Sequence, residues 1–305
     1  MSIRPVAGLY HGSMPDPVIA DEQLAALLRD AAAQPAGPTD VATMRRAGRA
    51  RAATRAPGPA MPATDTTIGG VPVRVYRPGA RVTVVYLHGG GFVLGDLETH
   101  DALVRRFAAA TDGTVVAVDY RRAPEDPWPA AVDDAVAVLT GLAGTGAPIA
   151  VAGDSAGGLL AILAALRLRG TVPLLAQLLI CPNTDPTLRS PSVTGKGQGW
   201  LLDADTLREW IAMWLPDPAT RALPATNALV ADLRGLPPAL IVTAEHDPLR
   251  DEGDAYAARL RDAGVPVIHR CEPGLIHNFP TLRDVSPACA AAESRFLADA
   301  AALLS

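Results

Sequence analysis

The sequence predicts an α/β fold with a mostly parallel central sheet flanked by helices. Its 305 residues are 49% hydrophobic and 19% charged, a globular composition that fits one large domain or two small ones at about 150 residues per domain. From Val71 onward, short β-branched runs alternate with helix-length stretches, which is typical of parallel strands joined by right-handed crossovers. The runs are apolar almost throughout, as strands covered on both faces require.

The predicted strands and helices follow one another through the rest of the chain. The strand-like runs are, in order, VPVRVY, VTVVYLH, TVVAVDY, PIAVAG, LLAQLLI, ALIVTA and VPVIHRC. Stretches with apolar or amphipathic periodicity lie between several of these runs, at Thr99–Ala110, Ala130–Leu142, Ala156–Arg169 and Asp251–Ala263. Strands alternating with helices of this length predict one continuous sheet.

Two segments interrupt this alternation and suggest how the chain is divided. Residues 1–65 hold one helix-like stretch followed by a segment rich in Pro, Arg and Ala, and residues 186–236 hold many prolines and one helical piece but no good strand. We interpret 186–236 as an insertion over the sheet edge where ligands bind, joined there by 1–65. The sheet domain is then built from residues 66–185 and 237–305.

The charge balance gives no sign of a nucleic-acid or membrane partner. Twenty-seven basic and 32 acidic side chains leave a net charge of −5, which is too mild to steer the protein towards either. Five arginines nevertheless lie between positions 45 and 55. They could form a patch for nucleic acid or an anionic membrane, or the solvated face of a helix, and we favour the solvated face.

The cysteines and the apolar stretches predict a cytoplasmic protein. Cys181, Cys271 and Cys289 are far apart with no CxxC pair, which fits neither a disulfide framework nor a zinc site and suits a reducing compartment. Residues 1–17 lack the apolar core of a secretory signal. The longest apolar stretch, Ala156–Leu166, is too short to span a bilayer. We therefore expect no metal and no stable membrane insertion.

The first motif that carries chemistry surrounds Ser155. The strand PIAVAG runs directly into Asp154, Ser155 and Ala156, and then into a helix. This is G-x-S-x-G in a strand–turn–helix context, the arrangement known as the nucleophile elbow. Glycines at 153 and 157 fit because side chains there would collide with neighbouring backbone in so tight a turn. Ser155 is the candidate nucleophile, and the alternative is a serine N-cap on a glycine-rich turn.

The second motif is HGGGF at 88–92, directly after the strand-like run VTVVYL. Acyl transfer develops an oxyanion that fixed N–H donors must stabilise, and glycines let the backbone come close to a substrate. The candidate donors are the amides of Gly89, Gly90, Gly91 and Ala156, the residue after the nucleophile. A phosphate-binding loop is the rival interpretation, but neither the Walker pattern nor GxGxxG occurs.

A serine nucleophile needs a histidine base. Folds built on this elbow place the triad in the order serine, acid, histidine, which excludes His11, His88 and His100. His269 lies within the strand-like run VPVIHRC and reads as a sheet residue, and His246 adjoins the candidate acid and is expected to point away from it. His277 lies in a glycine loop just past the last strand and is the candidate base.

The base in turn needs a carboxylate to orient it. Asp247 follows the strand ALIVTA in a loop about 30 residues before the candidate base. Glu245 and Asp251 are the fallback candidates, although Asp251 also fits the first turn of a helix, where the dipole favours acids. Asp154 lies beside the nucleophile and reads as a supporting group rather than as a triad member.

Taken together, the motifs resemble those of a known family. HGGGF, GDSAGG, DPLRDEG and GLIHNF occur in this order, and 71–78, 95–101 and 120–134 are also similar to stretches of that family. The family is the bacterial hormone-sensitive-lipase-like branch of the α/β-hydrolases, in its GDSAG subgroup, and the likeness covers roughly residues 65–285. One departure is Asn278, where glycine is common, and it concerns the shape of the loop rather than the base.

The resemblance implies hydrolysis of carboxylic esters, typically with short to medium acyl chains, without a cofactor. It implies Ser155, Asp247 and His277 as the triad, the Gly89–Gly91 and Ala156 amides as the oxyanion hole, and a helical cap formed by 1–65 and 186–236. It also implies a possible homodimer. The same triad serves an amide or lactone hydrolase, and a non-catalytic ligand receptor on this scaffold is a further alternative that predicts loss of a triad residue.

The substrate pocket is the least readable part of the sequence. Aromatic and aliphatic side chains near the motifs and in the insertion are candidates to line the pocket or the interior of the cap. With Asp154 beside the nucleophile and Ile276 beside the base, the candidate substrate-binding residues also include Phe92, Trp200, Leu201, Trp210 and Trp214. Because the chain has only four phenylalanines, we expect an aliphatic acyl site.

Overall fold

A mixed sheet forms the centre of the computed structural model, which describes residue 19 and the ranges 21–33, 40–77 and 80–305. Its strands are β1 (Ala63–Ile68), β2 (Val71–Tyr76), β3 (Thr83–Leu87), β4 (Thr114–Val118), β5 (Ile149–Asp154), β6 (Leu174–Ile180), β7 (Ala239–His246) and β8 (Val267–Ile276). They lie in the order β1-β2-β4-β3-β5-β6-β7-β8. The β1–β2 and β2–β4 pairs are antiparallel, and all pairs from β4–β3 to β7–β8 are parallel.

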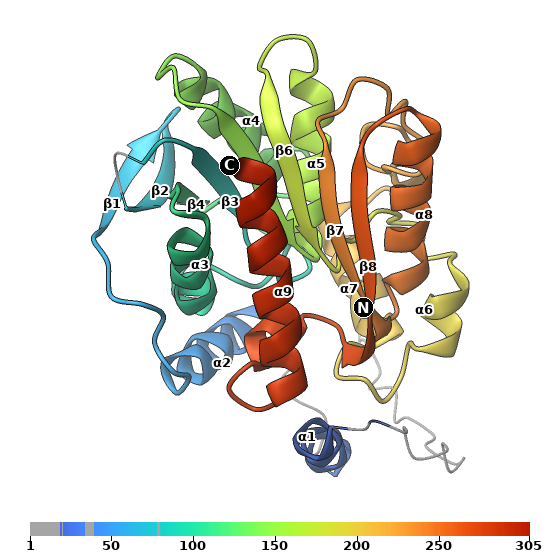
Figure 1. The fold of residues 1–305 in the computed structure, drawn as a ribbon. Helices are drawn as coiled ribbons and strands as arrows, with labels where there is room; N and C mark the ends of the chain where they lie inside the picture. Colours follow the sequence, from blue (N-terminus) through green and yellow to red (C-terminus); the bar gives the residue numbers. More distant parts are fainter. Residues whose placement is uncertain (1–18, 20, 34–39, 78–79) are drawn as a thin grey trace.

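Helices cover both faces of the sheet. They are α1 (Glu22–Ala32), α2 (Val41–Ala53), α3 (Leu97–Thr111), α4 (Ala130–Ala143), α5 (Ala156–Leu168), α6 (Pro191–Gly195), α7 (Ala204–Trp214), α8 (Arg250–Asp262) and α9 (Pro287–Leu304), with 3₁₀ turns η1 (Pro218–Ala222) and η2 (Phe279–Leu282). Figure 1 shows α9 and α3 in front of the sheet, whereas α4, α5 and α8 lie on the other face. This architecture confirms the predicted α/β fold.

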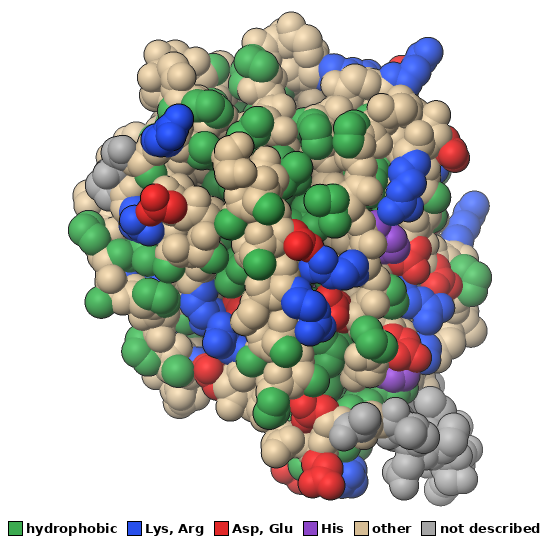
Figure 2. Space-filling view, in the orientation of Figure 1, with side chains coloured by type: hydrophobic (Ala, Val, Ile, Leu, Met, Phe, Trp, Pro, Cys, Tyr) green, Lys and Arg blue, Asp and Glu red, His purple; other side chains and the backbone are tan. Residues whose placement is uncertain are grey.

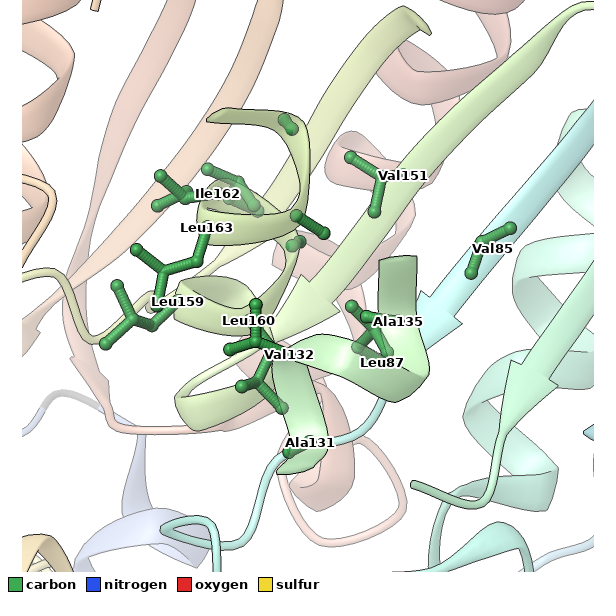
Figure 3. Close-up of a cluster of buried hydrophobic side chains, with 14 of the residues drawn as sticks. Val85, Leu87, Ala131, Val132, Ala135, Val151, Leu159, Leu160, Ile162 and Leu163 are labelled. Carbon is green, nitrogen blue, oxygen red and sulfur yellow. The ribbon is translucent and has the colours of Figure 1, made fainter. Parts of the chain in front are cut away.

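The core around α5 covers one face of this sheet, and a second buried cluster with α3 and α9 covers the other. Leu159, Leu160 and Leu163 of α5 belong to the same buried cluster as Val85 of β3 and Val151 of β5 (Figure 3). Burying one leucine stabilises the fold by about 1.5–3 kcal/mol. The helix that carries the elbow is therefore fixed by the same core that holds the sheet together.

The structure differs from the sequence prediction at several places. The segment rich in Pro, Arg and Ala contains a second helix, α2. β1 begins at Ala63, inside the segment predicted to end at 65, and pairs with β2. In the β7–β8 ladder, Ala244 pairs with Glu272 and, after a register shift, His246 pairs with Ile276. β8 therefore continues to Ile276, and the residues predicted to form the loop before His277 are largely strand. The final helix α9 has no counterpart in the prediction.

The described part of 1–65 that precedes β1 and the insertion 186–236 are here called the outer segments. Every residue of 186–236 is described, and none of them lies in a strand. Figure 1 shows α2, α6 and α7 gathered at the same end of the sheet. In the described residues, no helix has both the length and the apolar character needed to cross a membrane.

Acidic and basic side chains are interspersed on the face that carries α3 and α9 (Figure 2). Beneath this face, where α3 meets α9, Arg106 and Arg283 both donate to the fully buried carboxylate of Glu293. The pairing leaves neither oxygen of this buried charge without a partner, which is the condition under which a buried carboxylate is tolerated.

Candidate active site

Ser155 lies in a strained turn between β5 and α5. Its φ is +54° and its ψ is −122°, a backbone conformation that L-residues rarely adopt and that persists only where the surroundings fix it. A Cβ added at Gly153 would overlap the carbonyl of Gly157, and one added at Gly157 would overlap that of Leu87. The two glycines are therefore required by close approach of the backbone, and the turn holds the serine at the carboxyl end of the sheet.

Three side chains from separate loops form a continuous hydrogen-bonded chain. Ser155 Oγ is 2.9 Å from Nε2 of His277, and Nδ1 of the same ring is 2.7 Å from Oδ2 of Asp247. An ionised carboxylate only accepts, so the Nδ1–H donates to Asp247 and leaves Nε2 to accept from the serine hydroxyl. The sequence reasoning named these three residues, and the structure brings them together.

Asp247 is held from its other side as well. The carboxylate is fully buried, and its Oδ1 accepts a hydrogen bond of 2.8 Å from the amide of Leu249. The fallback acids are engaged elsewhere: Glu245 accepts from the Gly274 amide at 2.8 Å, and Asp251 accepts from the Ser192 amide at 2.8 Å. Among the three acids considered, only Asp247 hydrogen-bonds to His277.

The two rejected histidines also have partners away from the nucleophile. His246 stacks on Trp200 with ring centroids 4.1 Å apart, and its Nδ1 is 3.1 Å from Nζ of Lys196. Burial, followed by the charge of Lys196, lowers the pKa of His246. His269 lies 2.9 Å from the carboxylate of Asp254. Both therefore contribute to local structure rather than to the Ser155 chain.

Asp154 supports the glycine loop and does not face a substrate. It is fully buried, with Oδ1 accepting from the Tyr86 hydroxyl at 2.8 Å and the Gly89 amide at 3.0 Å, and Oδ2 lies 3.3 Å from Nε2 of His100. Burial acts to raise its pKa, but His100 and Tyr86 outweigh this and lower it. The prediction that Asp154 binds substrate is therefore wrong, because its oxygens are occupied inside the protein.

The hydrogen bond from its amide to Asp154 distinguishes Gly89 from the other candidate oxyanion donors. Because the Gly89 amide is bonded to Asp154, it points into the protein rather than towards Ser155. The next glycine begins a tight turn, in which the carbonyl of Gly90 accepts from the amides of Val93 and Leu94 at 3.1 and 2.7 Å. Gly90 and Gly91 have φ values of +124° and +61°. The amides of Gly90, Gly91 and Ala156 remain as candidate donors.

His88 supports this turn in a way that the sequence did not reveal. Its Nδ1 is 2.8 Å from the carbonyl of Gly89, and its ring stacks on Tyr120 with centroids 4.2 Å apart. Burial, followed by the charge of His100, lowers the pKa of His88 to about 3. A neutral ring with hydrogen on Nδ1 can donate to the Gly89 carbonyl, so the first residue of HGGGF fixes the glycines that follow it.

The hydrophobic candidates for substrate binding lie in three kinds of surroundings. Trp210 of α7 lies against the glycine loop so closely that a Cβ at Gly91 would overlap its indole, whereas Leu201 is exposed. The others are buried in packing contacts: Phe92 stacks on Trp214 with centroids 3.8 Å apart. Ile276 and Trp200 are likewise buried. Of the candidates in the insertion, Trp210 lies against Gly91 and Trp214 against Phe92, so both contact the glycine loop.

Cys181 is a neighbour of the triad that the sequence reasoning left aside. Its sulfur, a carboxylate oxygen of Asp247 and a ring nitrogen of His277 lie within 4.8 Å of one another. Burial, followed by the charge of Asp247, raises the pKa of the Cys181 thiol well above its ordinary value. Since the thiolate is the reactive form of cysteine, the protonated thiol does not compete with Ser155 as a nucleophile.

A parallel sheet with a serine elbow and a hydrogen-bonded histidine and aspartate defines the class of α/β-hydrolases. A family model described as the α/β hydrolase fold matches residues 84–281. The chain belongs to this family, in its bacterial hormone-sensitive-lipase-like branch.

Relatives of known name are similar over most of the chain. A carboxylesterase of Mycobacterium tuberculosis, NlhH, is 45% identical over 245 residues, covering 75% of this chain and 77% of that protein. An ethyl acetate hydrolase of Pseudomonas putida is 40% identical over 226 residues, covering 68% and 71%.

Solved structures show the same similarity. A thermostable esterase from Pseudomonas putida ECU1011 superposes with a TM-score of 0.88 at 30% identity, covering 94% of this chain and 98% of that one. An esterase from the bacterial hormone-sensitive lipase family gives a TM-score of 0.85 at 28% identity, covering 93% and 98%.

Proposed function

We propose that this protein hydrolyses carboxylic esters through an acyl-enzyme formed on Ser155. The observation that carries the proposal is the unbroken chain from Ser155 Oγ through His277 to Asp247, with steps of 2.9 and 2.7 Å. A serine is a weak nucleophile until an adjacent base takes its proton, and this geometry provides the base and the group that orients it. The names of the carboxylesterase relatives support the same reaction.

In the first half of the reaction, Ser155 Oγ attacks the ester carbonyl carbon while Nε2 of His277 takes the hydroxyl proton. Asp247 stabilises the imidazolium and keeps its Nδ1–H in place. The tetrahedral intermediate collapses when its bond to the alkoxy oxygen breaks, and His277 returns the proton to that oxygen. The alcohol leaves, and the acyl group remains on the serine.

In the second half, water replaces the alcohol. His277 takes a proton from the water, the hydroxide attacks the acyl carbonyl, and the bond to Ser155 Oγ breaks as the proton returns to the serine. Both halves pass through an oxyanion. We assign its stabilisation to the amides of Gly90, Gly91 and Ala156, each of which would contribute about 3–4 kcal/mol if it behaves as other oxyanion donors do.

We further propose that the substrates carry short to medium acyl chains and bind beneath a cap made by the outer segments. Two contacts support the cap: Trp210 lies against Gly91, and Lys196 lies 3.1 Å from His246 beside the triad acid. A bulky indole so close to the glycine loop restricts the space beside the serine. The presence of an ethyl acetate hydrolase and an acetyl-hydrolase among the relatives also favours small acyl groups.

The test is a panel of p-nitrophenyl esters from acetate to palmitate, with one p-nitroanilide and one lactone, on the wild type and on Ser155→Ala. We expect the highest kcat/KM among the acetate to octanoate esters and a loss of about 10⁶-fold in kcat for Ser155→Ala. Anilide or lactone hydrolysis faster than that of every ester would favour the alternative leaving groups. Ester hydrolysis that survives in Ser155→Ala would overturn the proposal.

A further inference from the structure

The arginines at 45–55 do not form one solvated face. They lie on or just after α2, a helix with no buried residue of its own. Arg46 reaches only the hydroxyl of Thr43 one turn away, at 2.7 Å. Arg45 and Arg49, in contrast, point towards the chain that follows the glycine loop, and Arg49 is 2.5 Å from the carboxylate of Asp96. Side-chain hydrogen bonds therefore attach the helix to the sheet domain, together with the half-buried Val41, which packs against the core.

Arg45 joins three parts of the chain with one side chain. Its Nε donates to the carbonyl of Val93 at 2.8 Å, and its Nη2 donates to the carbonyl of Ala123 at 2.9 Å. Both terminal nitrogens also bond the carboxylate of Glu125, at 2.8 and 2.9 Å. The Arg45 side chain is only 20% exposed. A planar guanidinium with donors in a fixed fork suits this arrangement, and an ammonium group cannot reproduce it.

Of the two carbonyls that Arg45 holds, that of Val93 lies in the turn that presents the candidate oxyanion donors, and that of Ala123 lies in a separate segment that hydrogen-bonds to this turn. The Val93 amide donates to the carbonyl of Gly90 at 3.1 Å, and the Ala123 amide donates to the carbonyl of Phe92 at 3.0 Å. Three successive residues of this turn, 90 to 92, have positive φ values of 124°, 61° and 66°. Such a backbone persists only where its surroundings over-determine it.

We propose that Arg45 is a positioning residue for the oxyanion hole: by bonding Val93, Ala123 and Glu125 at once, it holds the turn so that the Gly90 and Gly91 amides face the reacting carbonyl. This inference rests on the proposed ester hydrolysis. It makes the N-terminal helix part of the support for catalysis, although α2 contributes no group that touches substrate. The role concerns the transition state, since the oxyanion exists only after attack.

The test compares Arg45→Met and Arg45→Lys with the matched control Arg46→Met on the same helix. For p-nitrophenyl butyrate, we expect Arg45→Met to lower kcat by about 10- to 100-fold, the range that small misplacements of catalytic groups cost, with little change in KM. Binding of a trifluoromethyl ketone, whose adduct with Ser155 carries the oxyanion, should weaken by a similar factor. Arg45→Lys should recover part of both losses, and Arg46→Met should match the wild type.

Two results would overturn the inference. One is a folded Arg45→Met with wild-type kcat and ketone affinity, and the other is a loss that falls on KM alone or is shared by Arg46→Met. Unfolding midpoints and circular dichroism establish which variants fold. If Arg45→Met does not fold, a folded Arg45→Lys with wild-type kcat and ketone affinity would overturn the inference in its place. Activity that survives in Ser155→Ala instead refutes the proposed function, so the two failures are distinguishable.

Discussion

The catalytic edge of the sheet and the outer segments are built in different ways. At the edge, main-chain geometry places the functional groups: φ is positive at Ser155 and at residues 90–92 of the glycine turn. The outer segments are joined to that edge by side chains, with Arg45 bonding the chain after the glycine loop, Trp210 lying on Gly91 and Lys196 reaching His246. The difference teaches that backbone turns place the groups assigned to the chemistry, whereas side-chain contacts, including the burial of Ile211, Trp214 and Leu215 in the core, attach the outer segments.

After loss of the nucleophile itself, the largest effect should come from the edge, in Asp247→Asn. An asparagine amide in place of the carboxylate favours the wrong tautomer of His277, so kcat should fall by about 10⁴-fold, as replacement of the triad aspartate does in a serine protease. Steady-state hydrolysis of p-nitrophenyl butyrate measures the loss. Asp251→Asn is the matched control because Asp251 lies in the same region but accepts from the Ser192 amide. Equal losses of kcat in both variants would contradict the assignment of Asp247 as the triad acid.

The next effect should appear where the two regions meet, in Gly91→Ala. The added Cβ would overlap the Trp210 indole, and φ at this position is +61°. The turn must therefore move and displace an oxyanion donor, which should lower kcat by about 10²–10³-fold. Adding Trp210→Ala should recover only part of the rate, because it relieves the overlap and leaves the backbone strain. Gly195→Ala in the insertion is the control, since open space surrounds its Cβ. Full recovery in the double variant would show that the cap contact alone matters.

The smallest effect should come from the outer segments, in Lys196→Met. Burial and the Lys196 charge both lower the pKa of His246, so removing the charge should raise that pKa, as a nuclear magnetic resonance titration of the ring would show. Because His246 is not bonded to Ser155, kcat should stay close to that of the wild type. A fall in kcat as large as that of Gly91→Ala would show that the cap contact reaches the triad and would break the distinction between the two regions.

The sequence was informative where glycines and strand ends constrain the backbone. The G-x-S-x-G elbow, the HGGG run and the order of Ser155, Asp247 and His277 could be found because each follows a predicted strand. Parallel strands bring their carboxyl ends to one edge, so residues far apart in the chain were expected to meet there. The fold could be predicted for the same reason, since nearly continuous apolar runs require a sheet covered on both faces.

The sequence was uninformative where a side chain chooses among several partners. Nothing in the arginine run distinguishes Arg45, which holds the chain after the glycine loop, from Arg46, which reaches only Thr43. The Gly89 amide could not be separated from its neighbours because its bond to Asp154 depends on where β5 ends. Phe92 was a candidate for either the pocket or the interior of the cap, and only the structure shows that its ring stacks on Trp214 of the insertion. Such choices follow from tertiary packing, not from local pattern.

The central claim is that Ser155 forms the covalent intermediate, and active-site labelling tests it most directly. The protein is treated with increasing amounts of a fluorophosphonate, and the modified residue is located by mass spectrometry while p-nitrophenyl butyrate hydrolysis is followed. We predict one label per chain, on Ser155, with activity falling in proportion to labelling and no label on Ser155→Ala. Hydrolysis that persists after complete labelling of Ser155, or a label on another residue that tracks the loss of activity, would contradict the claim.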